Sequence, residues 1–506
     1  MEIGNMLLNN GCQFIQYSII PIKHKTYTMK QNIIYSLLII LMISSCKVGP
    51  DYQRPVLSQP DTFRFDSIST AEDTVINLKW WELFQDEELR AFIDTSLKYN
   101  PDVLIAASRI EEARAVVGYN KADMWPSFGY DGSALRMQNN MPSLGITGPF
   151  NSFSGAANVA WELDFWGKFR RSTEAARNEL LASGYGHRAV QISLISSVAS
   201  IYFQLLDFDS RLEISRMTLE SRKESLRIIR ERFDKGIVPE IDLNQAEIQE
   251  AIAAAAVPFY ERMVAQTENA MSILLANNPG KIKRTHTLRD ELVPPKIPSG
   301  IPSAVLERRP DINQAEQLLA AQNARIGVAV AMRFPSISLT GMLGAASTDL
   351  TTITTGDALI WSFAGGIVGP IFQFGKNKRR VDIERQRMYQ DSLYYFKTVL
   401  QAFREVEDAL VEIKTLKKES GARERQMTAA ENAAMLSTER YNGGVTSYLE
   451  VLDSERSKFN AQLASSEVYQ QYLNAFVFLY KALGGGWISE EEMKQVGKNA
   501  NQNNSK

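Results

Sequence analysis

Cys46 is the residue whose setting points most clearly to a chemical role. It follows Ile43-Ser44-Ser45 at the end of an 11-residue apolar run, Ile33–Ile43, and Lys30 precedes that run. A basic residue, a short apolar run and small residues before a cysteine are typical of a bacterial lipoprotein signal, whose cysteine is acylated and becomes the first residue of the mature chain. We therefore expect an N-palmitoyl and S-diacylglycerol lipid on Cys46. The alternative is ordinary signal cleavage beside an incidental cysteine.

The residues before this signal do not resemble part of a signal peptide. Residues 1–28 are long for a basic leader and contain Pro21, whereas Met29-Lys30 starts a signal of ordinary length. We interpret 1–28 as an extension from a misassigned start, 29–45 as the signal peptide and 46–85 as an N-terminal arm. Cys12 is then lost, so no disulfide is expected.

Nothing in the sequence indicates catalysis or a bound metal. His24, His187 and His286 lie in unrelated contexts, without a serine or cysteine partner motif. Gly484-Gly485-Gly486 follows an expected helix and is interpreted as a helix stop, not as a phosphate-binding loop. Three histidines and two cysteines are too few for a Cys/His zinc module. We expect no enzyme activity, no metal and no cofactor besides the lipid.

Charge and hydropathy exclude two further classes of protein. The 56 Lys and Arg against 58 Asp and Glu give a net charge of -2, so the chain has no electrostatic footprint for nucleic acid. No apolar run reaches the roughly 20 residues of a transmembrane helix. The strands of a membrane β-barrel are short and give a weaker signal, so they remain possible.

The chain is a duplication. Asn100-Pro101-Asp102 has a counterpart in Arg309-Pro310-Asp311, and matching pairs recur 208 or 209 positions apart. The other pairs are Pro126 and Pro335, Gly167 and Gly375, Gly236 and Gly444, and Glu247 and Glu455. Two copies of one structural unit are therefore expected, at 86–277 and 303–487, joined by a proline-rich linker at 278–302 and followed by a polar, disordered tail at 488–506.

The sequence of each copy predicts the same elements in the same order. A short helix leads to a β segment at about 126–166 or 335–374, and a very long helix follows at about 168–235 or 376–442. A glycine turn then leads to a second helix at 239–277 or 446–483. Apolar residues step by four and three along both long helices, which is coiled-coil spacing. They are Leu194, Val198, Ile201, Leu205, Phe208 and Leu212 in the first copy, and Val399, Phe403, Val406, Leu410 and Ile413 in the second.

The β segments have the alternation of membrane strands. In Asn151–Trp166 the odd positions are mostly apolar and the even ones small or polar, whereas Ala358–Phe374 reads as apolar on both faces. A soluble sandwich strand is the alternative interpretation. Two strands per copy give four per chain. An open sheet edge cannot face lipid, and closed barrels have at least eight strands. Membrane strands therefore require a shared barrel, of eight strands in a dimer or twelve in a trimer.

Several short motifs together carry a resemblance to a known family. They are Cys46-x-Val48-Gly49-Pro50-Asp51-Tyr52-x-Arg54-Pro55, Trp80-Trp81 with Phe84 and Asp86, Arg308-Arg309-Pro310-Asp311-Ile312, and Arg440-Tyr441-x-x-Gly444-Val445-x-x-Tyr448-Leu449-x-Val451-Leu452-Asp453. The chain resembles the outer-membrane factors of bacterial tripartite efflux pumps, in the lipoprotein branch of the TolC-like family. The resemblance implies an α+β membrane protein. It would be a homotrimer, with a 12-stranded outer-membrane β-barrel that continues into a periplasmic α-helical coiled-coil barrel.

The family also implies a function and partners. We expect a lipid-anchored, passive export conduit for small molecules such as drugs, toxic compounds or metal ions, which works with a periplasmic adaptor protein and an inner-membrane pump of the RND type. Two alternatives remain open, a protein-secretion conduit and a non-conducting coiled-coil spacer lipoprotein. No nucleic-acid partner is expected.

Two candidate sites follow from the last motif and its repeat equivalent. We expect two turns at the periplasmic tip, one with Arg232 and Gly236 and the other with Arg440 and Gly444. In the family this tip binds the adaptor protein. The simpler interpretation is that each turn is only a solvated helix reversal. Leu449 and Asp453, one helical turn apart, match positions that close the channel in this family. The alternative is that Leu449 belongs to the heptad core and Asp453 is a solvated charge. The repeat equivalents are Ile241 and Gln245.

Overall fold

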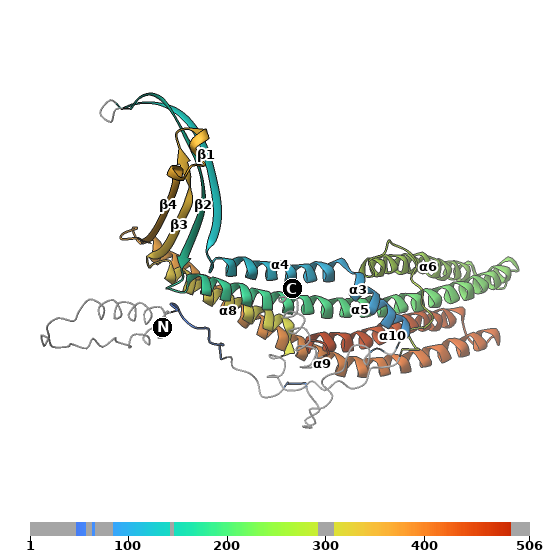
Figure 1. The fold of residues 1–506 in the computed structure, drawn as a ribbon. Coiled ribbons are helices and arrows are strands. Elements are labelled where there is room, and N and C mark those ends of the chain that lie inside the picture. The colour runs from blue at the N-terminus through green and yellow to red at the C-terminus, as the bar shows by residue number, and fades with distance from the viewer. Residues whose placement is uncertain are drawn as a thin grey trace.

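The computed structural model describes residues 47–56, 63–65, 84, 86–141, 146–291 and 308–486. Cys46, the signal peptide and the extension before it, and residues 488–506 lie outside this part. The molecule is elongated, with a curved four-stranded sheet at one end and a bundle of long helices that extends away from it (Figure 1).

The two copies have matching elements in the same order, and their helices are equal in length. After helix α3 (Glu87–Tyr99), the first copy consists of α4 (Pro101–Ala122), β1 (Ser127–Met141), β2 (Ile146–Leu163), α5 (Lys168–Asp234) and α6 (Glu240–Leu274). The second consists of α8 (Pro310–Ala331), β3 (Ser336–Ser347), β4 (Leu359–Val368), α9 (Lys376–Asn442) and α10 (Tyr448–Ala482). Both short helices have 22 residues, both long helices 67 and both final helices 35. The duplicated fold is thus confirmed.

The two Pro-Asp motifs join short helices end to end. Asn100 caps α4 and donates from Nδ2 to the carbonyl of Leu274 at the end of α6, at 3.0 Å. Arg309 before α8 donates to the carbonyl of Ala482 at the end of α10, at 2.8 Å. Each pair of shorter helices therefore forms one column beside a 67-residue helix, which is about 100 Å long at 1.5 Å per residue.

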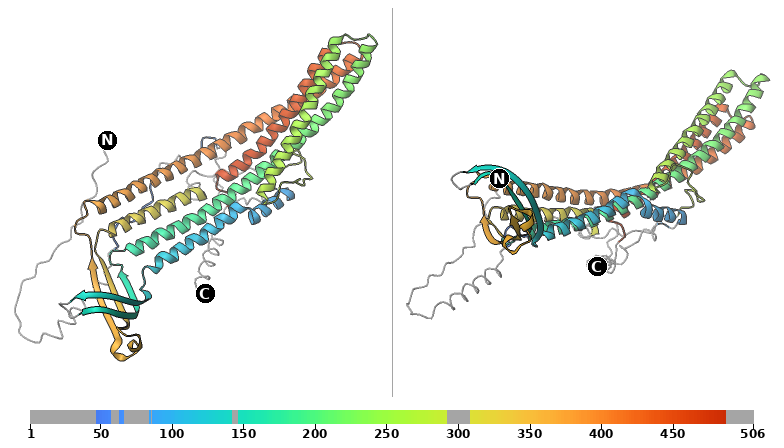
Figure 2. Two further views of the ribbon diagram at one scale, coloured as in Figure 1. Left: turned by 90° about the horizontal axis from the view of Figure 1, so that it is seen from above. Right: turned by 45° about the horizontal axis from the view of Figure 1, so that its top comes forward.

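The columns lie side by side in a fixed order. Near the sheet the order is α4, α5, α8, α9, and farther away α6 packs on α5 while α10 packs on both α5 and α9 (Figure 2). The predicted heptad positions carry this packing. Those that are buried are Leu194, Val198, Leu205, Leu212, Val399 and Val406. α5 also contains one stretch apolar enough to cross a membrane, but half of it is buried inside the bundle, as in the core helix of a soluble protein.

The strand expected at Ala358–Phe374 is shorter than predicted. A 3₁₀ turn, Gly356–Ala358, precedes β4, and the strand ends at Val368. Pro370 lacks the N–H that a strand needs for its ladder, so pairing stops before it. Gly369 also lies so close to Pro335 that a Cβ would come within 2.6 Å of it.

Candidate functional site

The register of the sheet places most of its large apolar side chains on one face. Directly paired residues share a face, and the pairs Phe128–Val159, Ala157–Leu343 and Leu343–Trp361 trace that face across all four strands. It includes Phe128, Tyr130, Ala134, Phe153, Ala157, Val159, Trp161, Leu163, Ile337, Leu339, Leu343, Leu359, Trp361, Phe363 and Ile367. Within this protomer Phe128, Trp361 and Phe363 are more than 70% exposed, so the band is not a protein core.

The opposite face is mostly polar or small, although it also carries Leu135, Met137, Phe150, Met342, Ile360 and Val368. It carries Ser127, Asp131, Ser133, Ser154, Asn158, Glu162, Ser336, Ser338, Thr340, Ser362 and Gly366, among others. Asn158 donates to Asp131, and the hydroxyls of Ser133 and Ser154 are 2.8 Å apart. On this face β4 has small residues between Ile360 and Val368, so the expectation that it is apolar on both faces was too simple.

The sheet has the dimensions of a membrane strand layer and two unpaired edges. β4 has 10 residues, and membrane strands need about 9–11. The β1–β2 hairpin extends beyond its partners, and the polar residues Arg136 and Asn151 of the apolar face lie in this extension. β1 and β4 are the outer strands of the order β1-β2-β3-β4. Because open edges are not stable in lipid, the sheet requires further copies to close.

The two predicted turns lie together at the far end of the bundle. Gly236 and Gly444 have φ of 70° and 71°, a conformation that favours glycine. In each turn two N–H groups return to the last carbonyls of the long helix, those of Gly236 and Ile237 in the first, and those of Gly444 and Val445 in the second. The guanidinium of Arg232 lies 5.1 Å from the ring centroid of Tyr441, so the first turn contacts the second copy.

The structure separates the candidate gate residues from the core. Val451 and Leu452 are buried among the tip residues, whereas Leu449 is 61% exposed. Within the protomer, Leu449 therefore lies outside the buried core at the tip. Asp453 is exposed and forms an ion pair with Arg456, a residue that the sequence analysis did not single out. Ile241, the repeat equivalent of Leu449, is 58% exposed.

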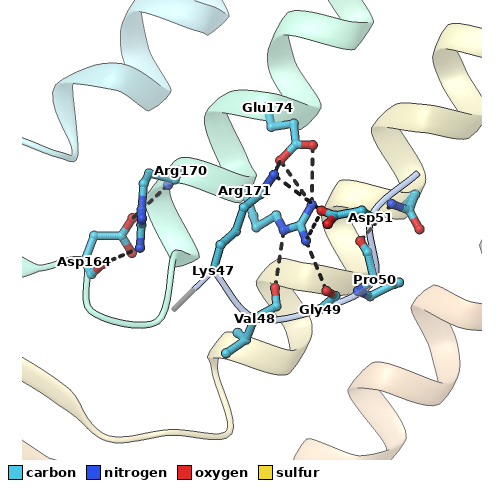
Figure 3. A network of polar contacts seen from close by, with 10 residues as sticks. Lys47, Val48, Gly49, Pro50, Asp51, Asp164, Arg170, Arg171 and Glu174 are labelled. Carbon is cyan, nitrogen blue, oxygen red and sulfur yellow. Dashed lines mark hydrogen bonds and ion pairs between the residues drawn. The ribbon is translucent and has the colours of Figure 1, made fainter. Parts of the chain in front are cut away.

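A buried arginine holds the segment that follows Cys46. Arg171, in the first turn of α5, is fully buried and donates to the carbonyls of Val48 at 3.3 Å and Gly49 at 3.1 Å. It also pairs with Asp51 at 3.0 Å and Glu174 at 3.2 Å (Figure 3). We call residues 47–51 with Arg171 and Glu174 the N-terminal clamp. Lys47 completes it with an ion pair to Glu174 at 2.7 Å.

The clamp brings the arm to the junction of sheet and helices. The N–H of Val48 donates to the carbonyl of Trp166, just before α5 begins. Gly49 lies against Gly327 of α8, where a Cβ would come within 2.6 Å of the facing Cα. Both copies therefore contribute to the binding of this segment. Sequence reasoning missed Arg171 because its partners are mainly backbone carbonyls more than a hundred positions away.

The segment between the two copies also contacts the bundle. Arg284 pairs with Asp209 of α5 and Glu268 of α6, and Arg289 pairs with Glu424 of α9 at 2.7 Å. Leu288, which precedes Arg289, is buried in a hydrophobic cluster with residues of α3, α5 and α10. We call residues 281–291 the strap; they lie within the described part of the predicted linker, residues 278–291.

One histidine does not have the unrelated context that the sequence suggested. His286 of the strap lies 3.2 Å from Asp86, measured from Nδ1 to Oδ2. Burial and its contact with Asp86 raise the pKa of Glu291 to about 8. His187 lies on α5, and His24 is outside the described residues.

Comparison with known proteins agrees with this geometry. The family described as "Outer membrane efflux protein" matches residues 92–277 and 301–485, once for each copy. The chain is 34% identical over 453 residues to the cation efflux system protein CusC of Escherichia coli O6:H1, covering 89% of this chain and 97% of the relative. It is 33% identical over 473 residues to the probable efflux pump outer membrane protein TtgC of Pseudomonas putida, covering 91% and 97%.

Solved structures show the same fold. The CmeC outer membrane channel of Campylobacter jejuni superposes with a TM-score of 0.82 at 28% identity, covering 90% of this chain and 99% of that one. A structure of CusC gives a TM-score of 0.78 at 32% identity, covering 87% and 100%.

Proposed function

The chain belongs to the outer membrane efflux protein family, and on this premise we propose that it is the passive export conduit of a tripartite efflux pump. The single observation that carries the proposal is the strand register. It places an apolar band on one face and a polar surface on the other, in a sheet with two open edges. Three copies give a closed barrel of twelve strands with a polar lumen, which continues into a barrel of helices across the periplasm.

The exposed apolar residues of α6 support this closure. Ile241, Ile248, Ile252 and Phe259 are all at least 44% exposed and are seven, four and seven positions apart. This is the spacing of a coiled-coil seam without a partner inside the protomer. α6 and α9 are at opposite edges of the helix order, so the seam of one copy packs against α9 of the next in the trimer.

Cys46 is the attachment point of the lipid in this proposal. The clamp places Lys47 beside Gly167, where α5 leaves the sheet, and a Cβ on Gly167 would lie 3.3 Å from the Cα of Lys47. Lys47, the residue that follows Cys46 in the sequence, therefore lies near the boundary of the apolar band. An N-palmitoyl and S-diacylglycerol group adds about 0.8 kcal/mol of anchoring per buried CH₂.

The channel closes at the tip in this proposal. Leu449 and Asp453 are exposed on one side of α10, so three-fold symmetry repeats each as a ring. An apolar ring obstructs the pore by dewetting, and a carboxylate ring attracts cations. The turns with Arg232, Gly236, Arg440 and Gly444 form the surface for the adaptor. Ile237 and Val445 are 67% and 71% exposed there, which supplies an apolar contact from each copy.

The substrate class is proposed from the relatives. CusC is named for cation efflux, TtgC and ArpC of Pseudomonas putida for efflux of toluene and antibiotics. We infer small molecules or ions as the cargo, and a passive role without a catalytic step. Deletion of the gene, complemented from a plasmid, tests this. The deletion should increase sensitivity to metal cations, solvents or antibiotics, and a panel with no sensitised compound would contradict it.

A further inference from the structure

Three metal-ligand side chains meet where the strap crosses the start of helix α3. Asp86, His286 and Glu291 each offer one ligand atom, and these atoms all lie within 4.8 Å of one another. Asp86 and His286 are 200 positions apart in the sequence, so the fold alone brings them together. The cluster lies outside the lumen face, the tip and the clamp.

The spacing of the imidazole and the carboxylate fits a transition-metal ion. His286 Nδ1 and Asp86 Oδ2 are 3.2 Å apart. Two ligand atoms that each bind zinc at about 2.0–2.1 Å in a tetrahedral arrangement are about 3.3 Å apart. The pair is therefore already spaced as two ligands of one ion, and a carboxylate oxygen of Glu291 lies within 4.8 Å of both atoms.

Asp86 is held in place as a ligand carboxylate would be. Its side chain is 3% exposed. Oδ1 accepts hydrogen bonds from the N–H groups of Glu88 and Leu89, at 2.6 and 3.0 Å, and Oδ2 accepts one from the hydroxyl of Tyr202 at 2.5 Å. Hydrogen bonds of this kind orient metal-binding groups, and their loss typically weakens binding 10- to 100-fold.

The electrostatic environment of the cluster favours a cation. Two of its three side chains, those of Asp86 and Glu291, are carboxylates, and Asp290 precedes Glu291 in the sequence. The two arginines of the strap are engaged elsewhere, Arg284 with Asp209 and Glu268 and Arg289 with Glu424. The two carboxylates of the cluster therefore remain for a cation.

The cluster is accessible from solvent. The side chain of His286 is 47% exposed and lines a cavity of about 530 Å³ between the strap, α5, α9 and α10. An ion can enter from this side, and a water molecule can occupy the remaining coordination position of the ion.

We propose that Asp86, His286 and Glu291 form a binding site for a divalent transition-metal ion of the zinc type. The mixed nitrogen and oxygen donors favour such an ion over magnesium, which prefers oxygen ligands. The bound ion joins the strap to the start of α3, and through Tyr202 to α5. The proposal does not depend on the cargo of the channel.

Isothermal titration of the detergent-purified, EDTA-treated trimer with ZnCl₂ tests the site. The wild type should bind one zinc ion per protomer, and His286→Ala and Glu291→Gln should each bind at least tenfold more weakly. His187→Ala is the matched control, because His187 is the other histidine among the described residues; it should bind like the wild type.

Thermal unfolding separates loss of the ligand from loss of the fold. Zinc should raise the melting temperature of the wild type and of His187→Ala, but not that of His286→Ala, whose melting temperature without zinc should stay near the wild-type value. If the wild type binds no zinc, or if His286→Ala binds and is stabilised as well as His187→Ala, the proposal is wrong.

Discussion

Replacing Arg171 by methionine should release the segment that follows Cys46. Methionine fills much of the same buried space but cannot donate to the carbonyls of Val48 and Gly49 or pair with Asp51. Two partly buried carbonyl contacts would then lose their charged donor. Arg170→Met is the matched control, because the neighbouring Arg170 pairs with Asp164.

The size of the effect follows from these contacts. A hydrogen bond to a charged group contributes about 1.5–3 kcal/mol. The two carbonyl contacts are partly buried and are counted at the lower end of this range, whereas Asp51 is exposed and its share is screened by solvent. We therefore expect docking of the segment to weaken by about 3 kcal/mol, or roughly 150-fold in the equilibrium between docked and released forms.

Trypsin cleavage after Lys47 measures this equilibrium. The docked Lys47 pairs with Glu174, so cleavage requires release, and its rate follows the released fraction when docking is fast. Mass spectrometry of the purified trimer should show cleavage about 100-fold faster in Arg171→Met, with Arg170→Met like the wild type. Equal rates in Arg171→Met and the wild type would refute the clamp.

Three further predictions concern the membrane, the lipid and the tip. Ala157→Arg places a charge on the apolar face at a cost of about 2–4 kcal/mol per copy, whereas the adjacent Asn158→Arg faces the lumen beside Asp131. Urea titration in lipid should therefore show destabilisation only for Ala157→Arg, and equal loss in both would contradict the assigned faces. Cys46→Ala should abolish the diacylglycerol adduct in mass spectrometry of the mature N-terminus, and a wild-type chain that starts elsewhere without lipid would refute the lipidation site. Gly236→Val with Gly444→Val forces a left-handed backbone on branched residues, at about 1–2 kcal/mol per turn. Cross-linking to the adaptor should fall while the trimer persists, and undiminished cross-linking would show that docking occurs elsewhere.

Much of the fold could be predicted because its signals are local. Proline, glycine and heptad positions mark the starts, ends and buried faces of α5 and α9, and they recur in both copies. The faces of β1 and β4 were less clear from their sequences, because small residues interrupt the alternation. The register with β2, which alternates clearly, assigns Phe128 and Trp361 to one face.

The sites were harder to predict because they depend on contacts between distant segments. Nothing around Arg171 marks its partners, since backbone carbonyls are the same in every residue type. The sequence around His286 did not indicate a binding site, because its partner Asp86 lies 200 positions earlier. For Leu449 the spacing allowed either core or surface, and only the packing of Val451 and Leu452 showed that the core positions were taken.

Single-channel recording in planar bilayers tests the central claim most directly. The purified wild-type trimer should insert and remain mostly closed, and the Leu449→Ala, Asp453→Ala double variant should open to a larger conductance with weaker cation preference, because both rings at the tip are removed. Leu452→Ala, which truncates a buried residue beside them, is the matched control and should not open in this way. A trimer that inserts but conducts in neither form would contradict the account of this chain as an export channel.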